Sequence, residues 1–344
     1  MGIISKIEAL DKKVFDLKGD FPIGLADGKM GQCVYFYCTG RMSNNKEYTQ
    51  KSETLIGEIL EQTGKSKMYD IKDGIAGIGL AVDYLVKNRF VKGNINEVLN
   101  DVDNELFRQI CKVLEFGNKD YSLQLQLVYY FIVRLKDQKK NSENEYCFKE
   151  AIISGINYIS EKINQNFPDE TASFKMENLF MQLLLVLSQC DELYKDKISI
   201  ILKDISLHIL SKIPVLHANR LFLLYAMDKI NKKIATKGWD EHIKLLARET
   251  NIEYVIENEL SDEIFFADGL PAIYFLLSGL GDYFSLDQIN KYKRHIIDKI
   301  ETSPTWGKLL DDESYLKYKS GLFSGYLGTS ILLQKHYKDE NRLN

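Results

Sequence analysis

The stretch DGIAGIGLAVDYL, residues Asp73–Leu85, is a glycine-containing turn that leads directly into an apolar helix. A glycine inside the first helical turn, such as Gly77, costs about 1 kcal/mol relative to alanine, so a compensating interaction is expected. Its small residues recur on one face, and close approach of a neighbouring helix is the usual reason for such a pattern. The stretch therefore predicts an inner helix that is packed closely against others.

The same pattern occurs three more times, with copies that begin at Asp27, Asp268 and Ser320. The spacing is 46 residues from Gly28 to Gly74, 195 from Gly74 to Gly269 and 52 from Gly269 to Gly321. Because 195 residues divide into four steps of about 49, three copies without glycines are expected between them. Apolar helices of the right length stand at those places, at Tyr121–Leu135, Ala172–Leu187 and His217–Met227. The count of copies is therefore seven.

Amphipathic stretches alternate with these apolar ones. They are Ile4–Leu17, Tyr48–Gln62, Ile95–Glu115, Phe148–Ile163, Leu193–Ile213, Asp240–Glu257 and Leu286–Ile300. A helix that is apolar on all sides must be buried on all sides, whereas a helix with a polar face looks outward. The sequence therefore predicts an all-α fold, an α/α toroid of seven inner and seven outer helices that forms one domain over residues 1–344. Period-two alternation at Ser122–Val128 is the strongest strand signal, but the helical repeat favours a helix there too.

Composition limits the classes of function. The formal net charge is −4 and no basic stripe stands out, so a nucleic acid is not expected as a partner. The five cysteines are scattered without a Cys-x-x-Cys pair, which indicates a reducing compartment rather than a disulfide framework. The longest uncharged stretch has 15 residues (320–334), too few to span a membrane. The sequence predicts a cytoplasmic protein without a membrane partner.

Seven outer–inner pairs with Gly-x-x-Gly openings resemble the lanthionine synthetase C-like family, the cyclases of thioether-bridged peptides. The resemblance covers essentially the whole chain as a repeat pattern. It is closest at Asp73–Leu85, which is similar to the start of the family's inner helices, and at Ser320–Leu333, which is similar to its final repeat. It implies the toroid fold and a role in the maturation of ribosomal peptides.

The resemblance also implies where a catalytic zinc ion would be held. Active members use Cys from a Trp-Cys-Tyr-Gly run in the fifth repeat, Cys and His from a Cys-His-Gly run in the sixth, and carry a His-Gly in the fourth. Here these places read LHAN at Leu216–Asn219, ADG at Ala267–Gly269 and SFKME at Ser173–Glu177. Only His217 and Asp268 could donate to a metal, and two ligands do not make a zinc site. No metal and no other cofactor is therefore expected.

The remaining candidates for a site lie at the starts of inner helices, at the mouth of the predicted toroid. Asp27, Asp73 and Asp268 each precede a glycine, where a carboxylate that caps the first turn is the simplest interpretation. The alternative is a set of carboxylates that act as acid and base, as in a glycosidase. His217 is either a structural histidine or a ligand or acid–base group. Asp73, Asp268 and His217 are thus the candidate substrate-binding residues.

Three hypotheses follow. The first is a cyclase-fold protein that lacks zinc, is non-catalytic or altered in function, and binds a precursor peptide or a partner enzyme of peptide maturation. The second is an α/α-toroid enzyme of another class that uses the mouth carboxylates for acid–base chemistry. The third, an active zinc cyclase with unrelated ligands, has the least support, because fold similarity alone does not establish activity.

Overall fold

The computed structural model describes residues 2–17, 21–116, 120–166, 173–175, 177–190 and 194–340. All regular structure in these residues is helical, in agreement with the prediction of an all-α fold. The chain divides into two compact units, which we describe separately. Unit 1 comprises Met1–Glu97, Leu260–Tyr274 and Lys293–Asn344, and unit 2 comprises Val98–Glu259 and Phe275–Tyr292.

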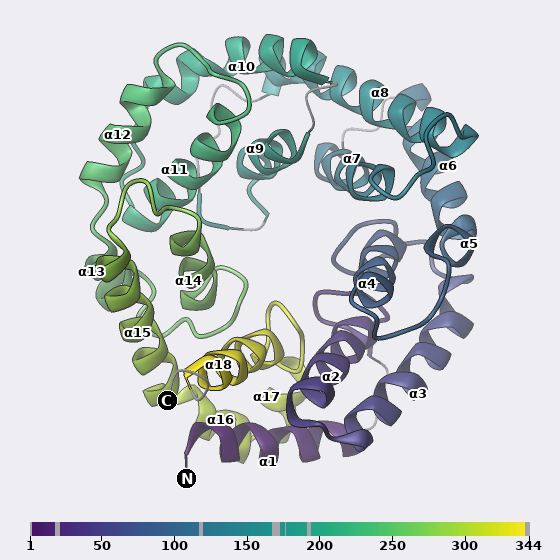
Figure 1. Cartoon of the computed structure of the whole chain (residues 1–344), viewed down its shortest axis with the longest axis vertical. Helices are drawn as coiled ribbons and strands as arrows, with labels where there is room; N and C mark the ends of the chain where they lie inside the picture. Colours follow the sequence, from purple (N-terminus) through teal and green to yellow (C-terminus); the bar gives the residue numbers. More distant parts are fainter. Residues whose placement is uncertain are drawn as a thin grey trace. The chain divides into compact units, whose positions relative to one another are not determined.

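Unit 1 holds outer–inner pairs from both ends of the chain (Figure 1). Its inner helices are α2 (Lys29–Ser43), α4 (Ile75–Lys87) and α18 (Tyr326–Glu340). Its outer helices are α1 (Ile3–Asp16) and α3 (Lys46–Thr63), with the shorter α16 (Thr305–Asp311) and α17 (Glu313–Tyr318). Helix α2 packs against α18, α3 and α4, so the first and last repeats of the chain are neighbours.

Unit 2 contains the middle repeats. Its inner helices are α7 (Tyr121–Leu135), α9 (Leu179–Gln189) and α11 (His217–Asn231). Its outer helices are α6 (Asn100–Phe116), α8 (Glu143–Asn166), α10 (Lys195–Leu210) and α12 (Trp239–Glu249), followed by α13 (Ile252–Tyr254) and a π-helix, η2 (Val255–Glu259). Three further helices cross the boundary between the two units: α5 (Ile95–Val98), α14 (Leu270–Ser278) and α15 (Leu286–Thr302).

Burial separates the two kinds of helix as the sequence pattern predicts. Helix α2 buries ten of its 15 residues, whereas α3 buries only Tyr48, Ser52, Leu55 and Ile59 among its 18. The bounds predicted for the third inner helix coincide with those of α7, so the alternation at Ser122–Val128 belongs to a helix. A helix of this kind gains its stability from tertiary burial of its apolar face rather than from local propensity.

Two predicted outer helices are broken. The stretch Ile95–Glu115 is divided at Leu99 into α5 and α6. The stretch Asp240–Glu257 is interrupted at Thr250, because the side chain of Asn251 accepts a hydrogen bond from the Tyr254 N–H and starts a new helix. The predicted start of the fourth inner helix at Ala172 lies outside the described residues, and the described helix begins at Leu179.

A buried aspartate on outer helix α1 joins two inner helices and one outer helix of unit 1. Asp11 on α1 accepts hydrogen bonds from Tyr35 on α2 (2.8 Å), Tyr48 on α3 (3.0 Å) and Tyr326 on α18 (3.1 Å). Burial raises the pKa of Asp11 to about 6, although the three tyrosine hydroxyls oppose this shift. One carboxyl group thus connects four helices of unit 1.

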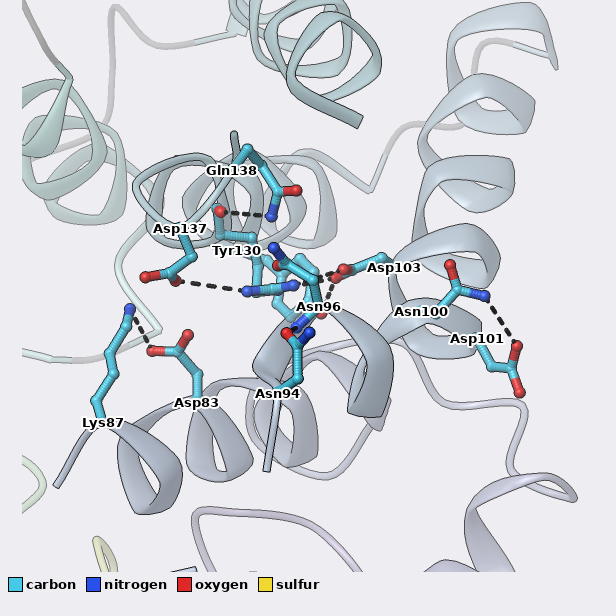
Figure 2. Close-up of polar contacts among 11 residues, drawn as sticks. Asp83, Lys87, Asn94, Asn96, Asn100, Asp101, Asp103, Tyr130, Asp137 and Gln138 are labelled. Atoms are coloured by element: carbon cyan, nitrogen blue, oxygen red, sulfur yellow. Dashed lines mark hydrogen bonds and ion pairs between the residues drawn. The ribbon is translucent and has the colours of Figure 1, made fainter. Parts of the chain in front are cut away.

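Unit 2 contains a related cluster between α6 and α7 (Figure 2). Arg134 is fully buried and donates to both carboxylate oxygens of Asp103, from Nη2 at 2.8 Å and from Nε at 3.0 Å. The hydroxyl of Tyr130 donates to the same carboxylate at 2.6 Å. Bidentate charge-assisted bonds of this kind fix the relative orientation of the two helices.

Candidate functional site

The four glycine-containing turns share one hydrogen-bond register. In each turn, the first amide of the inner helix donates to the carbonyl oxygen seven residues earlier. The pairs are Lys29 to Pro22 (2.8 Å), Ile75 to Met68 (3.0 Å), Leu270 to Glu263 (2.9 Å) and Tyr326 to Lys319 (2.9 Å). The equivalent glycines are therefore Gly28, Gly74, Gly269 and Gly325. The predicted alignment of the last copy on Gly321 is wrong by four residues.

Glycine is required because each turn folds back on itself. A Cβ atom on Gly28 would lie 2.3 Å from the Pro22 carbonyl oxygen, and one on Gly77 would lie 1.9 Å from that of Ile71. Real Cβ atoms do not approach carbonyl oxygens so closely. The predicted cause, close approach of a neighbouring helix, is therefore secondary: the main contact is with the chain's own turn.

Neighbouring turns of unit 1 are joined by backbone hydrogen bonds between equivalent residues. Ala267 N–H donates to the Phe323 carbonyl (2.8 Å), Phe323 N–H to that of Ala26 (3.0 Å), and Ala26 N–H to that of Lys72 (2.9 Å). Each of these residues lies two positions before its turn's glycine. We call this series the turn ladder. It brings Asp27, Asp73 and Asp268, which directly follow three of its members, to equivalent positions.

Asp27 has a structural role in this arrangement. Its Oδ1 accepts a hydrogen bond from the backbone N–H of Ser324 at 3.0 Å. It does not cap its own helix, because the N-cap residue of α2 is Gly28 and no side chain caps that end. The capping interpretation is thus wrong for Asp27, whose carboxylate joins the first turn to the last.

Asp73 differs from Asp27 in its environment. The N-cap of α4 is Gly74, again without a side-chain cap, so Asp73 is not a capping residue either. Its backbone N–H donates to Asp70 Oδ1 at 2.7 Å. The pKa of the half-buried Asp73 carboxyl is raised by burial and by the negative charges of Asp70 and Asp27, against the opposing effect of Lys72. A carboxyl group that favours its proton in this way is a candidate general acid.

Asp268 occupies a left-handed backbone conformation with a φ of 59°. Asp is among the few non-glycine residues that tolerate this region, so the local backbone already accounts for its presence. It is half-buried and belongs to unit 1, as do Asp27 and Asp73. The third candidate, His217, belongs to unit 2.

His217 is the first residue of α11, and its ring is held by hydrogen bonds. Nδ1 lies 3.1 Å from the Asn251 backbone N–H and 3.3 Å from Arg220 Nη1. Both neighbours can only donate, so Nδ1 accepts and the neutral ring carries its proton on Nε2. In this tautomer neither nitrogen offers a free lone pair to a metal ion.

A residue that sequence analysis missed completes this end of α11. The Glu259 carboxylate, at the end of η2, accepts from the N–H groups of His217 and Ala218, each at 2.8 Å. A carboxylate at a helix N-terminus accepts hydrogen bonds from the free amides, and its negative charge interacts favourably with the positive end of the helix dipole. Glu259 is 42 residues distant in sequence, so no local pattern could have identified it.

The expected zinc positions do not carry a set of residues that fits a zinc ion. Within the described part of the chain, no three His, Cys, Asp or Glu side chains form a group that could hold a metal. Ala267 has a methyl side chain, and its N–H belongs to the turn ladder. Asn219 accepts from the Phe174 N–H at 2.6 Å. A tetrahedral site needs four donors, of which Cys and His are the commonest.

Solved structures of similar fold exist for this chain. Nisin cyclase has a similar structure, with a TM-score of 0.63 and 13% sequence identity over 97% of this chain and 93% of that chain. The chain therefore has the α/α-toroid fold of nisin cyclase, and the resemblance to the lanthionine synthetase C-like family is confirmed at the level of the fold. No family model and no curated protein sequence matches the chain.

Proposed function

We propose that this chain is a relative of the lanthionine cyclases that works without zinc and binds a precursor peptide, or a partner enzyme, in the maturation of thioether-bridged peptides. The proposal rests on the residues that stand where the fifth and sixth repeats of the active cyclases hold zinc. There the His217 Nδ1 lone pair already accepts hydrogen bonds, and Ala267 offers no side-chain donor at all.

Thioether formation needs a thiolate, and zinc supplies one by lowering the pKa of the substrate thiol. Without zinc the protein would need another cation near the thiol. Arg220, a cation in the first turn of α11, is already bonded, because Nε donates to the Pro214 carbonyl (2.5 Å) and Nη1 to that of Glu249 (2.7 Å). Binding without thiol activation is therefore the role that these residues favour.

Exposed apolar side chains around the start of α11 provide a surface for such binding. In the loop that precedes α11, Val215 is 85% exposed and Leu216 is 51% exposed. Tyr254 is 47% exposed, and its ring lies 5.4 Å from that of His217. Exposed apolar groups that gather at one place are typical of interaction sites. The partner that fits is an apolar segment of a peptide.

The test measures binding of reduced Ser/Thr/Cys-rich peptides that contain an apolar segment, using fluorescence anisotropy with the full chain. We expect saturable binding that Val215→Asp with Leu216→Ser weakens about tenfold or more, since each buried aliphatic side chain contributes about 1.5–3 kcal/mol. Leu286→Ser is the matched control, because Leu286 is 72% exposed on a different helix. Absence of binding, or equal loss in the control, would refute the proposal.

The raised pKa of Asp73 supports a second candidate function, acid–base catalysis at the glycine-containing turns of unit 1. A protonated Asp73 could serve as general acid, with Asp70 as the neighbouring carboxylate. Turnover of a glycoside or another acid-labile substrate that is lost in Asp73→Asn but retained in Asp287→Asn, on outer helix α15, would favour this function over the first.

No described helix is long and apolar enough to cross a membrane. A cytoplasmic setting, in which peptide-maturation enzymes would meet a reduced precursor, is part of the proposal.

A further inference from the structure

A second, separate feature of unit 1 lies where α2 and α4 end and α3 begins. A cavity of about 210 Å³ opens there. Its lining residues are Tyr37, Gly40, Arg41, Asn44, Asn45, Lys46, Thr49, Arg89 and Phe90. One water molecule needs only about 10–15 Å³ on this measure, so the cavity has room for an oxyanion group and a short carbon chain.

The charge around this cavity is strongly one-sided. Arg41, Lys46 and Arg89 line it and no acidic residue does, although the chain as a whole carries a net charge of −4. None of these three cations forms an ion pair with any residue that the structure describes. Glu47 follows Lys46 in the first turn of α3, but it is exposed and outside the lining. Three uncompensated cations around one concave space attract anions.

Part of the cavity is rigid before any ligand binds. Arg41 Nη1 donates to the Asn88 carbonyl at 2.7 Å, and its guanidinium carbon lies 3.4 Å from the centre of the Phe90 ring. A stacked and hydrogen-bonded guanidinium loses little side-chain entropy when a ligand arrives. Its remaining N–H groups stay available for an oxyanion.

Two other polar residues of the cavity are placed by left-handed turns at the ends of helices. Asn44, at the end of α2, and Arg89, just after α4, both adopt the left-handed conformation, with φ values of 54° and 57°. The side chain of Asn45 accepts a hydrogen bond from the Glu47 N–H and caps α3, an 18-residue helix that begins at Lys46 in the lining. The positive end of its dipole adds to the charge of the three cations.

We infer that this cavity is an anion-binding site for a phosphate or carboxylate group of a small ligand, held by Arg41, Lys46 and Arg89. Tyr37 and Phe90, whose ring centres are 5.7 Å apart, provide an apolar wall for the carbon portion of that ligand. This inference does not depend on peptide binding at α11, since the two places share no residues.

The test is isothermal titration of the full chain with inorganic phosphate and, separately, with succinate. We expect saturable binding of at least one of them, weakened as sodium chloride is raised. Phosphate binding without succinate binding would identify the ligand as a phosphate, and the reverse as a carboxylate. Lys46→Gln and Arg89→Asn should each weaken binding about tenfold, because each removes a hydrogen bond to a charged group. Asn is chosen at position 89 because it tolerates the left-handed conformation.

Lys65→Gln is the matched control, since it removes the same charge from an exposed position outside the cavity. Thermal unfolding of each variant establishes that it folds. The inference is overturned if neither anion binds saturably, or if binding to Lys65→Gln falls as much as binding to Arg89→Asn.

Discussion

Gly24 lies directly against the backbone of Asp73: a Cβ atom on Gly24 would come within 2.4 Å of the Asp73 Cα atom. The relationship recurs one repeat away, where a Cβ on Gly321 would come within 2.9 Å of the Asp27 Cα. Neighbouring turns of unit 1 are therefore in backbone contact twice, through the turn ladder and through these glycines. The position of Asp73 depends on a residue that precedes it by 49 positions.

Substitution of Gly24 by alanine should destabilise the protein by about 1–3 kcal/mol, as overpacking in a closely fitted interior does. Urea denaturation of the full chain measures this. Gly57→Ala is the control, because Gly57 lies inside α3 with no atom near its absent Cβ. That variant should gain about 0.5–1 kcal/mol from helix propensity. Equal stability of the two variants would show that the turns are not in tight contact.

The titration of Asp11 should make the protein less stable as the pH rises from about 4 to about 6. Burial raises the pKa of Asp11 from 3.8 to about 6 in the folded protein, so within this window only the folded state still holds the proton. Stability is therefore fully present below the lower value and is lost as the pH passes the higher one, by about 3 kcal/mol at about 1.4 kcal/mol per pKa unit.

The measurement compares urea denaturation of the wild type and Asp11→Asn across this pH range. Other carboxyl groups titrate in both proteins, so the difference between the two curves isolates Asp11. We expect the wild type to lose stability relative to the variant between pH 4 and pH 6. Parallel curves would mean that the Asp11 carboxyl titrates at its ordinary pKa.

Replacement of Arg134 by methionine should cost about 3–5 kcal/mol, because it leaves the Asp103 carboxylate buried without its partner. The double variant Arg134→Met with Asp103→Leu should recover much of this loss, since no buried charge is left at position 103 and Asp137, the second ion-pair partner of Arg134, is partly exposed to solvent. Arg108→Met on α6 should change stability little, because its ion pair with Glu105 is exposed. Thermal and urea unfolding measure all three. A double variant that is less stable than Arg134→Met would contradict this account of the cluster.

Glu259→Ala should destabilise the protein by about 1–2 kcal/mol through loss of the cap on α11. Glu259→Gln, which keeps one acceptor oxygen, should lose less. Glu253→Ala serves as the control, since Glu253 is exposed and its ion pair with Lys291 is long, at 3.9 Å. If the alanine variant at position 259 is as stable as this control, Glu259 is not the cap.

The fold was accessible from the sequence because helical periodicity is local. The apolar run of α7 and the glycine-containing turn before α4 both carry their signal within about 15 residues. The register of the last repeat was not accessible, because Gly321 and Gly325 both fit the pattern. The hydrogen bond from Tyr326 to Lys319 and the place of Phe323 in the turn ladder distinguish them.

The site was less accessible, since its contacts join distant residues. Glu259 reaches His217 across 42 positions, and Tyr326 reaches Asp11 across 315. The cationic cavity combines three separate elements without a motif. Sequence analysis placed Asp73 and His217 at inner-helix starts, and their roles in binding stay predictions. Capping, the role preferred for Asp73, is not observed at α4, whose N-cap is Gly74 without a side-chain cap, whereas α11 is capped by the distant Glu259.

We propose that this chain, which has the fold of nisin cyclase, holds no zinc ion at its inner-helix starts. The most direct measurement is the metal content of the purified full chain after expression with added zinc. We expect zinc well below one ion per chain, and unchanged thermal stability when a chelator is added. One zinc ion per chain that is lost in His217→Ala or Asp268→Ala would contradict the account.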